Sequence, residues 1–261
     1  MDKKLIVANW KNHPDTLAEA EGVLDFVNDH LDSLGETKEL SLVICPPFVF
    51  LEDIGKILKM SHLRHNTELG AQDIALDDQT TATGEISGRM LRSLGVRYVI
   101  VGHSERRWKL GESDRIVNQK LKTVLKDEMI PIVCVGELNK DEDFEDFLRL
   151  QVEESFRGLS SDELARCIIA YEPVWAISSN AGAHPDTSES ALESIKIIQN
   201  ALIENWKLKI GNLPKILYGG SVNSKNASDF LSQKEIDGVL VGGASVNKEE
   251  FVKILSVVTR L

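Results

Sequence analysis

The feature that most constrains the fold is a regular alternation of short apolar runs with amphipathic segments, repeated eight times along the chain. Each apolar run has the length of a buried strand and is rich in Val, Ile and Leu. These runs predict strands at residues 5–8, 42–45, 67–72, 96–101, 130–135, 167–171, 215–218 and 238–241. Between them, apolar residues recur at steps of three and four, which indicates helices. The helices are expected at residues 16–34, 50–60, 88–94, 116–126, 141–157, 190–206, 227–231 and 249–258.

Strands that alternate with helices pair in parallel, because each helix returns the chain to the same end of the sheet. Eight such units in a chain of 261 residues are typical of a closed (β/α)8 barrel. We therefore expect an α/β fold of eight parallel strands, which forms a single catalytic domain over residues 1–261. The alternative is an open doubly wound sheet, which is less favoured because no G-x-G-x-x-G follows the first strand.

The charge and the cysteines exclude several classes of function. The net charge is −11, which argues against nucleic-acid and anionic-membrane binding, since both need a basic surface. A local site for a small anion is still compatible with this charge. Three separated cysteines and no C-x-x-C indicate reduced, buried thiols in a cytosolic protein. No signal segment or apolar run of membrane-spanning length occurs, so we expect a cytoplasmic protein.

No metal site is expected. His62 and His65 share one helix face or turn, but no third ligand stands at a suitable spacing. Arg106 and Arg107 are interpreted as structural: one pairs with a carboxylate, with Glu85 as the candidate, and braces the loop.

Chemically active side chains follow several of the predicted strands. In a (β/α)8 barrel, the residues just after each strand share one face, where catalytic groups gather. The first strand delivers Asn9 and Lys11 to this face, the fourth delivers His103 and Glu105, and the sixth delivers Glu172. One amide, one ammonium, one imidazole and two carboxylates therefore converge.

A carboxylate and an imidazole at one small site suit proton transfer next to a carbonyl group. Glu172 precedes Pro173, which restricts its backbone and holds it at the end of the strand. It would take a carbon-bound proton, while His103 would polarise the carbonyl. His103 stands at a helix N-terminus, whose positive end disfavours imidazolium, so we expect a neutral ring. Lys11 would offer a fixed positive charge to an anionic substrate.

Two glycine turns follow the seventh and eighth strands and favour a phosphate site. Gly219-Gly220-Ser221 and Gly242-Gly243 let backbone N–H groups approach an anion without obstruction by a Cβ atom. The loops after these two strands commonly bind phosphate in this fold. Either pair alone would indicate an ordinary turn, whereas two on adjacent strands favour phosphate.

A loop of mixed character follows Glu172. Residues 174–177 continue apolar, and residues 178–183 are small and polar, ending in a glycine-containing stretch. Such a loop can close over a site as a lid. An ordinary surface loop is the alternative.

These motifs resemble the triosephosphate isomerase family, in the family's order from the first strand to the last. The matching stretches are Asn9-Trp10-Lys11, Gly70-Ala71-Gln72, Thr83-Gly84-Glu85-Ile86-Ser87, Gly102-His103-Ser104-Glu105-Arg106-Arg107, Val133-Cys134-Val135-Gly136-Glu137, Ala170-Tyr171-Glu172-Pro173-Val174-Trp175-Ala176-Ile177, Tyr218-Gly219-Gly220-Ser221-Val222 and Val241-Gly242-Gly243-Ala244-Ser245. The resemblance implies a TIM barrel that interconverts dihydroxyacetone phosphate and D-glyceraldehyde 3-phosphate through an enediol(ate), in glycolysis and gluconeogenesis. No cofactor or metal is implied.

The resemblance also implies roles for particular residues. Glu172 is the base and His103 the electrophile, with Asn9 and Lys11 as substrate ligands and Glu105 as a further catalytic residue. Backbone N–H groups near Ser178, Ser221, Gly242 and Gly243 hold the phosphate. A homodimer through the loop around Thr83 is implied.

Three features depart from the family pattern: the lid tip, the far hinge of the lid and the expected subunit contact. The lid tip is Ser178-Ser179-Asn180, where the family usually has Gly-Thr-Gly, and Gly182 loosens the far hinge. Asn12 and Ala82 replace bulkier residues at the expected subunit contact, which predicts a weaker dimer.

Other functions remain open on these residues. The altered lid keeps an isomerase of a longer phosphosugar, such as a tetrulose phosphate, as an alternative. A barrel that binds phosphate without catalysis is a second, although Asn9, Lys11, His103 and Glu172 together argue against it. A phosphoribosyl-type barrel shares the phosphate loops but not the motif around His103.

Overall fold

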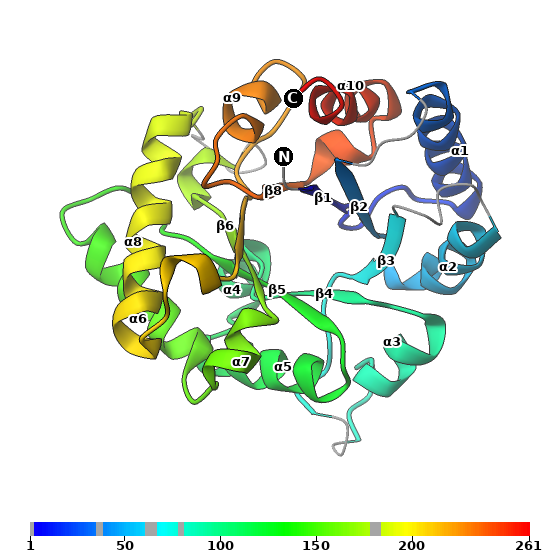
Figure 1. The fold of residues 1–261 in the computed structure, drawn as a ribbon. Helices are drawn as coiled ribbons and strands as arrows, with labels where there is room; N and C mark the ends of the chain where they lie inside the picture. The colour runs from blue at the N-terminus through cyan, green and yellow to red at the C-terminus, as the bar shows by residue number, and fades with distance from the viewer. Residues whose placement is uncertain (1–2, 35–38, 61–66, 78–80, 178–183) are drawn as a thin grey trace.

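Eight parallel strands close into a barrel in the order β1 to β8, with helices around it (Figure 1). The structure is a computed structural model that describes residues 3–34, 39–60, 67–77, 81–177 and 184–261. The strands are β1 (Lys4–Asn9), β2 (Leu40–Cys45), β3 (Thr67–Ala71), β4 (Tyr98–Val101), β5 (Ile130–Val135), β6 (Ile168–Tyr171), β7 (Lys215–Tyr218) and β8 (Gly238–Val241). Each strand pairs with the next, and β8 pairs back onto β1, where Ile6 lies opposite Val239. The closed barrel is confirmed, and the doubly wound alternative is wrong.

The helices surround the strands on the outside of the barrel (Figure 1). They are α1 (Leu17–Leu34), α2 (Leu51–Met60), α3 (Gly88–Leu94), α4 (Ser104–Leu110), α5 (Asp114–Lys126), α6 (Phe144–Phe156), α7 (Ser161–Ala165), α8 (Ser188–Trp206), α9 (Ala227–Leu231) and α10 (Lys248–Val258). Short 3-10 turns are η1 (Phe48–Phe50), η3 (Val174–Ala176), η4 (Ile210–Asn212) and η5 (Gly243–Ser245). The sequence pattern did not predict α7 or give bounds for α4, although it predicted the equally short helices α9 and α3.

The two faces of the strands build two apolar layers. On β1, Leu5 and Val7 join a small cluster with buried residues of other strands, such as Ile132 on β5, and this cluster fills the barrel interior. The alternate residues Ile6 and Ala8 join the larger cluster between strands and helices. Because both faces are buried, the strands are continuous apolar runs rather than alternating ones.

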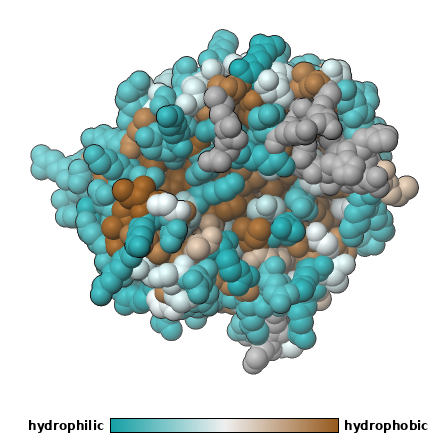
Figure 2. Space-filling model, in the orientation of Figure 1, coloured by the Kyte–Doolittle hydropathy of each residue, from teal (hydrophilic) through white to brown (hydrophobic). Residues whose placement is uncertain are grey.

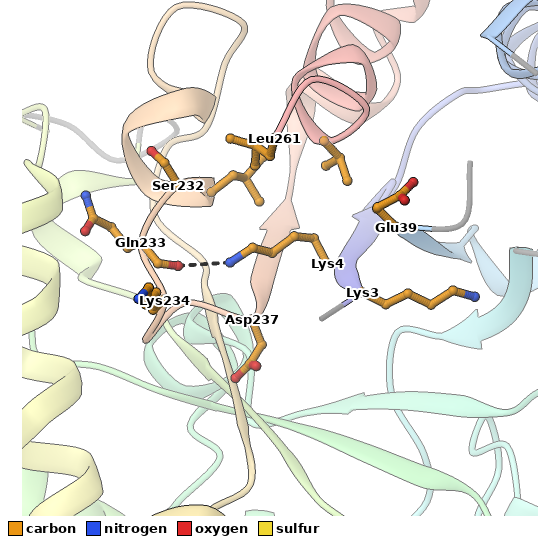
Figure 3. Close-up of a pocket in the computed structure, with 10 residues that line it drawn as sticks. Lys3, Lys4, Glu39, Ser232, Gln233, Lys234, Asp237 and Leu261 are labelled. Atoms are coloured by element: carbon orange, nitrogen blue, oxygen red, sulfur yellow. Dashed lines mark hydrogen bonds between the residues drawn. The ribbon is translucent and has the colours of Figure 1, made fainter. Parts of the chain in front are cut away.

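The two chain ends lie at the same end of the barrel, opposite the carboxyl ends of the strands. A cavity of about 410 Å³ opens there, lined by Lys3, Lys4, Glu39, Leu231, Ser232, Gln233, Lys234, Asp237, Val258 and Leu261 (Figure 3). Lys4 points across it and donates to the carbonyl oxygens of Gln233 and Ile236. Its ammonium is therefore used in holding the start of β1 to the segment before β8.

Hydrophilic side chains cover much of the molecular face seen in Figure 2, with hydrophobic ones showing between them. Of the helices in the described parts of the chain, none is both long and apolar enough to cross a membrane.

Candidate active site

The carboxyl ends of the strands bring the predicted polar residues to one end of the barrel. Asn9 is the last residue of β1, His103 stands two residues after β4, and Glu172 directly follows β6. All three side chains are buried. The position of each follows from where its strand ends, so the barrel itself sets their spacing.

One carboxylate oxygen of Glu172 is held by the first residue of α4. Its side chain is only 1% exposed, and Oε2 accepts a hydrogen bond of 2.8 Å from the backbone N–H of Ser104. Oε1 lies 3.2 Å from Nε2 of His103 but makes no hydrogen bond within the described residues. Oε1 is therefore the oxygen that a bound molecule can use.

Two glycines leave the space in which Glu172 sits. A Cβ atom on Gly219 would lie 2.8 Å from Cγ of Glu172. A Cβ atom on Gly136 would collide with the carbonyl oxygen of Glu172. Glycine is required at both positions by packing, because either methyl group would push the carboxylate or its backbone out of place.

His103 caps the N-terminus of α4. Its Nδ1 accepts a hydrogen bond of 3.2 Å from the backbone N–H of Glu105. A ring nitrogen that accepts a hydrogen bond carries no proton, so the proton of the ring is on Nε2. This contact favours the tautomer with its proton on Nε2, the nitrogen that lies 3.2 Å from Oε1 of Glu172.

Lys11 has a backbone φ of 55°, a left-handed conformation that non-glycine residues rarely adopt. Gln72 stabilises this conformation by donating to the carbonyl oxygens of Lys11 at 2.6 Å and Cys45 at 3.0 Å. Oδ1 of Asn9 accepts from the backbone N–H of Lys11 at 3.1 Å. The amides of Asn9 and Gln72 thus aim the lysine at the site.

Glu105 pairs with Lys11, whose Nζ lies 3.1 Å from Oε1. Burial alone would raise the pKa of Glu105, but Lys11 and neighbouring positive charges outweigh it and hold that pKa below its ordinary value. Lys109 approaches the same oxygen at 3.4 Å from the exposed side. Glu105 is therefore ionised and fixes the ammonium of Lys11.

The glycine turn after β8 lies near this lysine. A Cβ atom on Gly242 would stand 3.3 Å from Cε of Lys11, whereas one on Gly243 would meet open space. Ser221 is half-buried at the end of the β7 turn. Ser178, the remaining residue predicted to bind phosphate, and the rest of the lid tip lie outside the described residues.

Several residues at the site were not predicted. Ser104, Gln72 and Cys134 belong to the matched motifs, but nothing in their residue types indicated these contacts. The Cys134 thiol is buried, and burial followed by the nearby charge of Glu172 raises its pKa well above the usual range. Glu137 accepts from Tyr171 Oη and Trp175 Nε1, both at 2.8 Å, and so ties the end of β5 to the segment after Glu172.

Arg106 and Arg107 are structural, but Glu85 is not their partner within this chain. Arg106 pairs with Asp73 at 2.8 Å and Glu112 at 2.7 Å. Arg107 bonds to the carbonyl oxygens of Gly102 and Cys134 and pairs with Asp114. Asp73 and Glu112 are buried beside Arg106, and Asp114 is partly buried beside Arg107, whereas Glu85 is exposed; charges attract more strongly where water screens them less.

The described residues contain no cluster of three or more His, Cys, Asp or Glu side chains arranged to hold a metal ion. His62 and His65 lie outside those residues.

A family comparison gives the same assignment as the motifs. The family described as triosephosphate isomerase matches residues 4–258. The chain belongs to this family. Among similar triosephosphate isomerases, that of Caldanaerobacter subterraneus subsp. tengcongensis is 39% identical over 259 residues, covering 98% of this chain and 100% of the relative. That of Dictyoglomus thermophilum is 39% identical over 98% of this chain and 99% of its own length.

A solved structure of triosephosphate isomerase, from Bartonella henselae, has the same fold. It superposes with a TM-score of 0.82 at 32% sequence identity, covering 98% of each chain. The triosephosphate isomerase family therefore matches this chain in sequence and in three dimensions over nearly its whole length.

Proposed function

We propose that the chain catalyses the reversible isomerisation of dihydroxyacetone phosphate and D-glyceraldehyde 3-phosphate through an enediol(ate), using Glu172 as base and His103 as electrophile. The observation that carries this proposal is the pairing of a buried carboxylate with a buried imidazole, Oε1 of Glu172 to Nε2 of His103 at 3.2 Å. The family membership supports the same aldose–ketose isomerase, a step of glycolysis and gluconeogenesis.

The geometry supports different chemical roles for the Glu172 carboxylate and the His103 imidazole. Oε1 of Glu172 would take the proton from the carbon next to the carbonyl and return it to the neighbouring carbon. Nε2–H of His103 would donate to the carbonyl oxygen and stabilise the charge that develops there. A neutral imidazole suits this role, because it can give and regain a proton between the two oxygens of the enediolate.

Lys11 and the turns would bind the substrate. The ammonium of Lys11 offers positive charge to the phosphate and to the enediolate, with Asn9 and Glu105 keeping it in place. The backbone N–H groups of Ser221, Gly242 and Gly243 would hold the phosphate, with that of Ser178 as a further donor. These assignments rest on the positions of the residues and on the family resemblance.

We also propose that the whole chain acts as a single domain, that it forms a homodimer through the loop around Thr83, and that it works in the cytoplasm. Exposure of Thr81, Ala82 and Thr83 in this chain is compatible with a partner at that loop. Sedimentation of the purified chain over a range of concentrations tests the dimer.

The experiment for the proposed activity is a coupled assay of chelator-treated protein on D-glyceraldehyde 3-phosphate and on a four-carbon phosphosugar. Rapid turnover of the three-carbon substrate alone supports the proposal. Preference for the four-carbon sugar would contradict it. The comparisons favour triose phosphate over both the longer sugar and a non-catalytic barrel.

A further inference from the structure

The glycine turn after β8 is stabilised by hydrogen bonds from a buried serine, Ser245. Oγ of Ser245 donates to the carbonyl oxygen of Gly242 at 2.7 Å, and its backbone N–H donates to the same oxygen at 2.8 Å. Ser245 is 0% exposed. Its side chain therefore does not face the mouth of the barrel, and its hydroxyl serves the turn.

This hydrogen bond fixes the direction of a neighbouring donor. In a trans peptide, the carbonyl of one residue and the N–H of the next point in opposite directions. Because Ser245 draws the Gly242 carbonyl toward η5, the Gly243 N–H is directed the other way. Open space lies beside Gly243, and Gly242 lies beside the Lys11 side chain. An anion there would meet both an oriented N–H and an ammonium.

The turn after β7 is fastened by an asparagine. Nδ2 of Asn226 donates to the carbonyl oxygen of Ser221 at 2.9 Å, and its Oδ1 accepts from the backbone N–H of Asn223 at 2.8 Å. The side-chain amide of Asn226 therefore links Ser221 and Asn223 within this turn. Asn226 directly precedes α9, whose Phe230 stacks on Tyr218 with ring centroids 3.9 Å apart.

The same turn has little freedom to move toward the barrel. A Cβ atom on Gly220 would collide with the hydroxyl of Tyr218. Ser224, farther along the turn, donates its N–H to Glu250 of α10 at 2.6 Å. Asn226 therefore holds Ser221 in a turn that packs closely against Tyr218 and is bonded to α10.

We propose that Asn226 and Ser245 are positioning residues of the phosphate subsite that do not contact the anion. Ser245 fixes the peptide plane that carries the Gly243 N–H, and Asn226 holds the carbonyl group of Ser221 and thereby the position of that residue. This inference rests on the proposed function for the identity of the substrate. Its consequence is selective: loss of either side chain weakens recognition of the phosphate group, while Glu172 and His103, on other strands, keep their geometry.

The test compares two substrates that differ only in the phosphate. Ser245→Ala and Asn226→Ala should each lower kcat/KM for D-glyceraldehyde 3-phosphate about 3- to 10-fold more than for D-glyceraldehyde, the effect of one hydrogen bond. The loss should come mainly from KM, because the N–H groups bind the phosphate equally before and during reaction. The dissociation constant of glycerol 3-phosphate, measured by calorimetry, should rise by the same factor.

Matched controls lose the same kind of hydrogen bond elsewhere. Ser93 donates to the carbonyl oxygen three residues earlier, also at 2.7 Å, on exposed α3. Asn118 donates to the carbonyl oxygen of Ser155 at 2.9 Å on α5. Ser93→Ala and Asn118→Ala should leave the ratio of the two substrates unchanged. Should an alanine variant fail to fold, Ser245→Cys and Asn226→Asp provide near-isosteric replacements for the same measurements.

The outcomes separate this inference from the proposed activity. Equal losses on both substrates, or unchanged binding of glycerol 3-phosphate, would overturn the positioning role. If the wild-type protein binds glycerol 3-phosphate but turns over no triose phosphate, the proposed activity fails. A weakened glycerol 3-phosphate complex in the variants would then still support the positioning role.

Discussion

Oε1 of Glu172 and Nε2 of His103 lie 3.2 Å apart, although their residues stand 69 positions apart in the sequence. The barrel makes this pairing, because it brings the ends of β4 and β6 to one rim. Each group is then held by a backbone N–H: Ser104 donates to the carboxylate and Glu105 to the imidazole. The N-terminus of α4 thus orients both partners.

Shortening the Glu172 side chain tests whether its carboxylate is the catalytic base. Glu172→Asp retracts the carboxylate by about one methylene length, so we expect kcat to fall about 100-fold or more with a much smaller change in KM. Steady-state kinetics on D-glyceraldehyde 3-phosphate measure both constants. Asp186→Glu, which adds one methylene group to a carboxylate side chain on the segment before α8, is the control. It should not reproduce this loss. A parallel rise in KM and fall in kcat for Glu172→Asp would count against the base assignment.

Removing the imidazole tests the electrophile. His103→Gln keeps a polar side chain but loses the Nε2–H, so we expect kcat to fall about 100- to 10,000-fold. His30, which bonds to Ser256 between α1 and α10, is the control, and His30→Gln should keep activity. Wild-type turnover by the His103 variant would exclude its proposed role.

Filling the space beside Glu172 tests the position of its carboxylate without removing a polar group. Gly219→Ala places a Cβ atom 2.8 Å from Cγ of Glu172, so the carboxylate must shift and kcat should fall about 100-fold. Gly211→Ala, where a Cβ atom meets nothing within 4 Å, is the control. Calorimetric binding of glycerol 3-phosphate shows whether the phosphate subsite survives, and a Gly219→Ala variant with full kcat would contradict the packing argument.

The Lys11–Glu105 pair predicts a pH dependence of stability. Since the folded-state pKa of Glu105 is lowered, its carboxylate stabilises the fold above its unfolded pKa of about 4.3, and this contribution is lost as pH falls through the folded pKa. Denaturant unfolding of wild type and Glu105→Gln across pH should therefore show a difference that is full above about pH 5 and declines in more acidic solution. Glu21→Gln, on the exposed side of α1, is the control. A difference that grows toward acid would have the wrong sign.

The three cysteine thiols should react slowly with thiol reagents in the folded protein. Cys45, Cys134 and Cys167 are free and buried, and burial raises the pKa of each thiol, that of Cys167 to about 12. At about pH 8 we expect a colorimetric thiol reagent to react slowly with the native protein and rapidly with all three after unfolding in guanidinium. Fast reaction of one thiol in the native state would reveal an opening near it.

The sequence predicted the barrel because strand-forming runs alternate with helices, and the last residue of each run then locates the site. In this way the sequence predicted that Asn9, His103 and Glu172 lie at one end of the barrel, since position after a strand is a local property. The bounds of β4 were less accurate: Val96 and Arg97 look like strand residues but lie before it, and Arg97 exposes much of its side chain.

Contacts between distant strands could not be predicted. Gln72 binds the carbonyl oxygen of Lys11, and Ser104 uses a backbone N–H, so neither contact depends on a recognisable pattern. Glu85 was a reasonable partner for Arg106 or Arg107 by charge, but Arg106 pairs with Asp73 and Glu112 in the structure. Such choices depend on packing between separate units, which no local periodicity encodes.

The central claim is that Glu172 removes a carbon-bound proton, and isomerisation of dihydroxyacetone phosphate in D2O tests it most directly. A proton held on a carboxyl group exchanges with solvent, so the D-glyceraldehyde 3-phosphate released should carry deuterium at C2, as read by NMR. The rate of incorporation should fall about 100-fold or more in Glu172→Asp. Product that keeps all of its original hydrogen, or incorporation at the wild-type rate in the variant, would contradict the account.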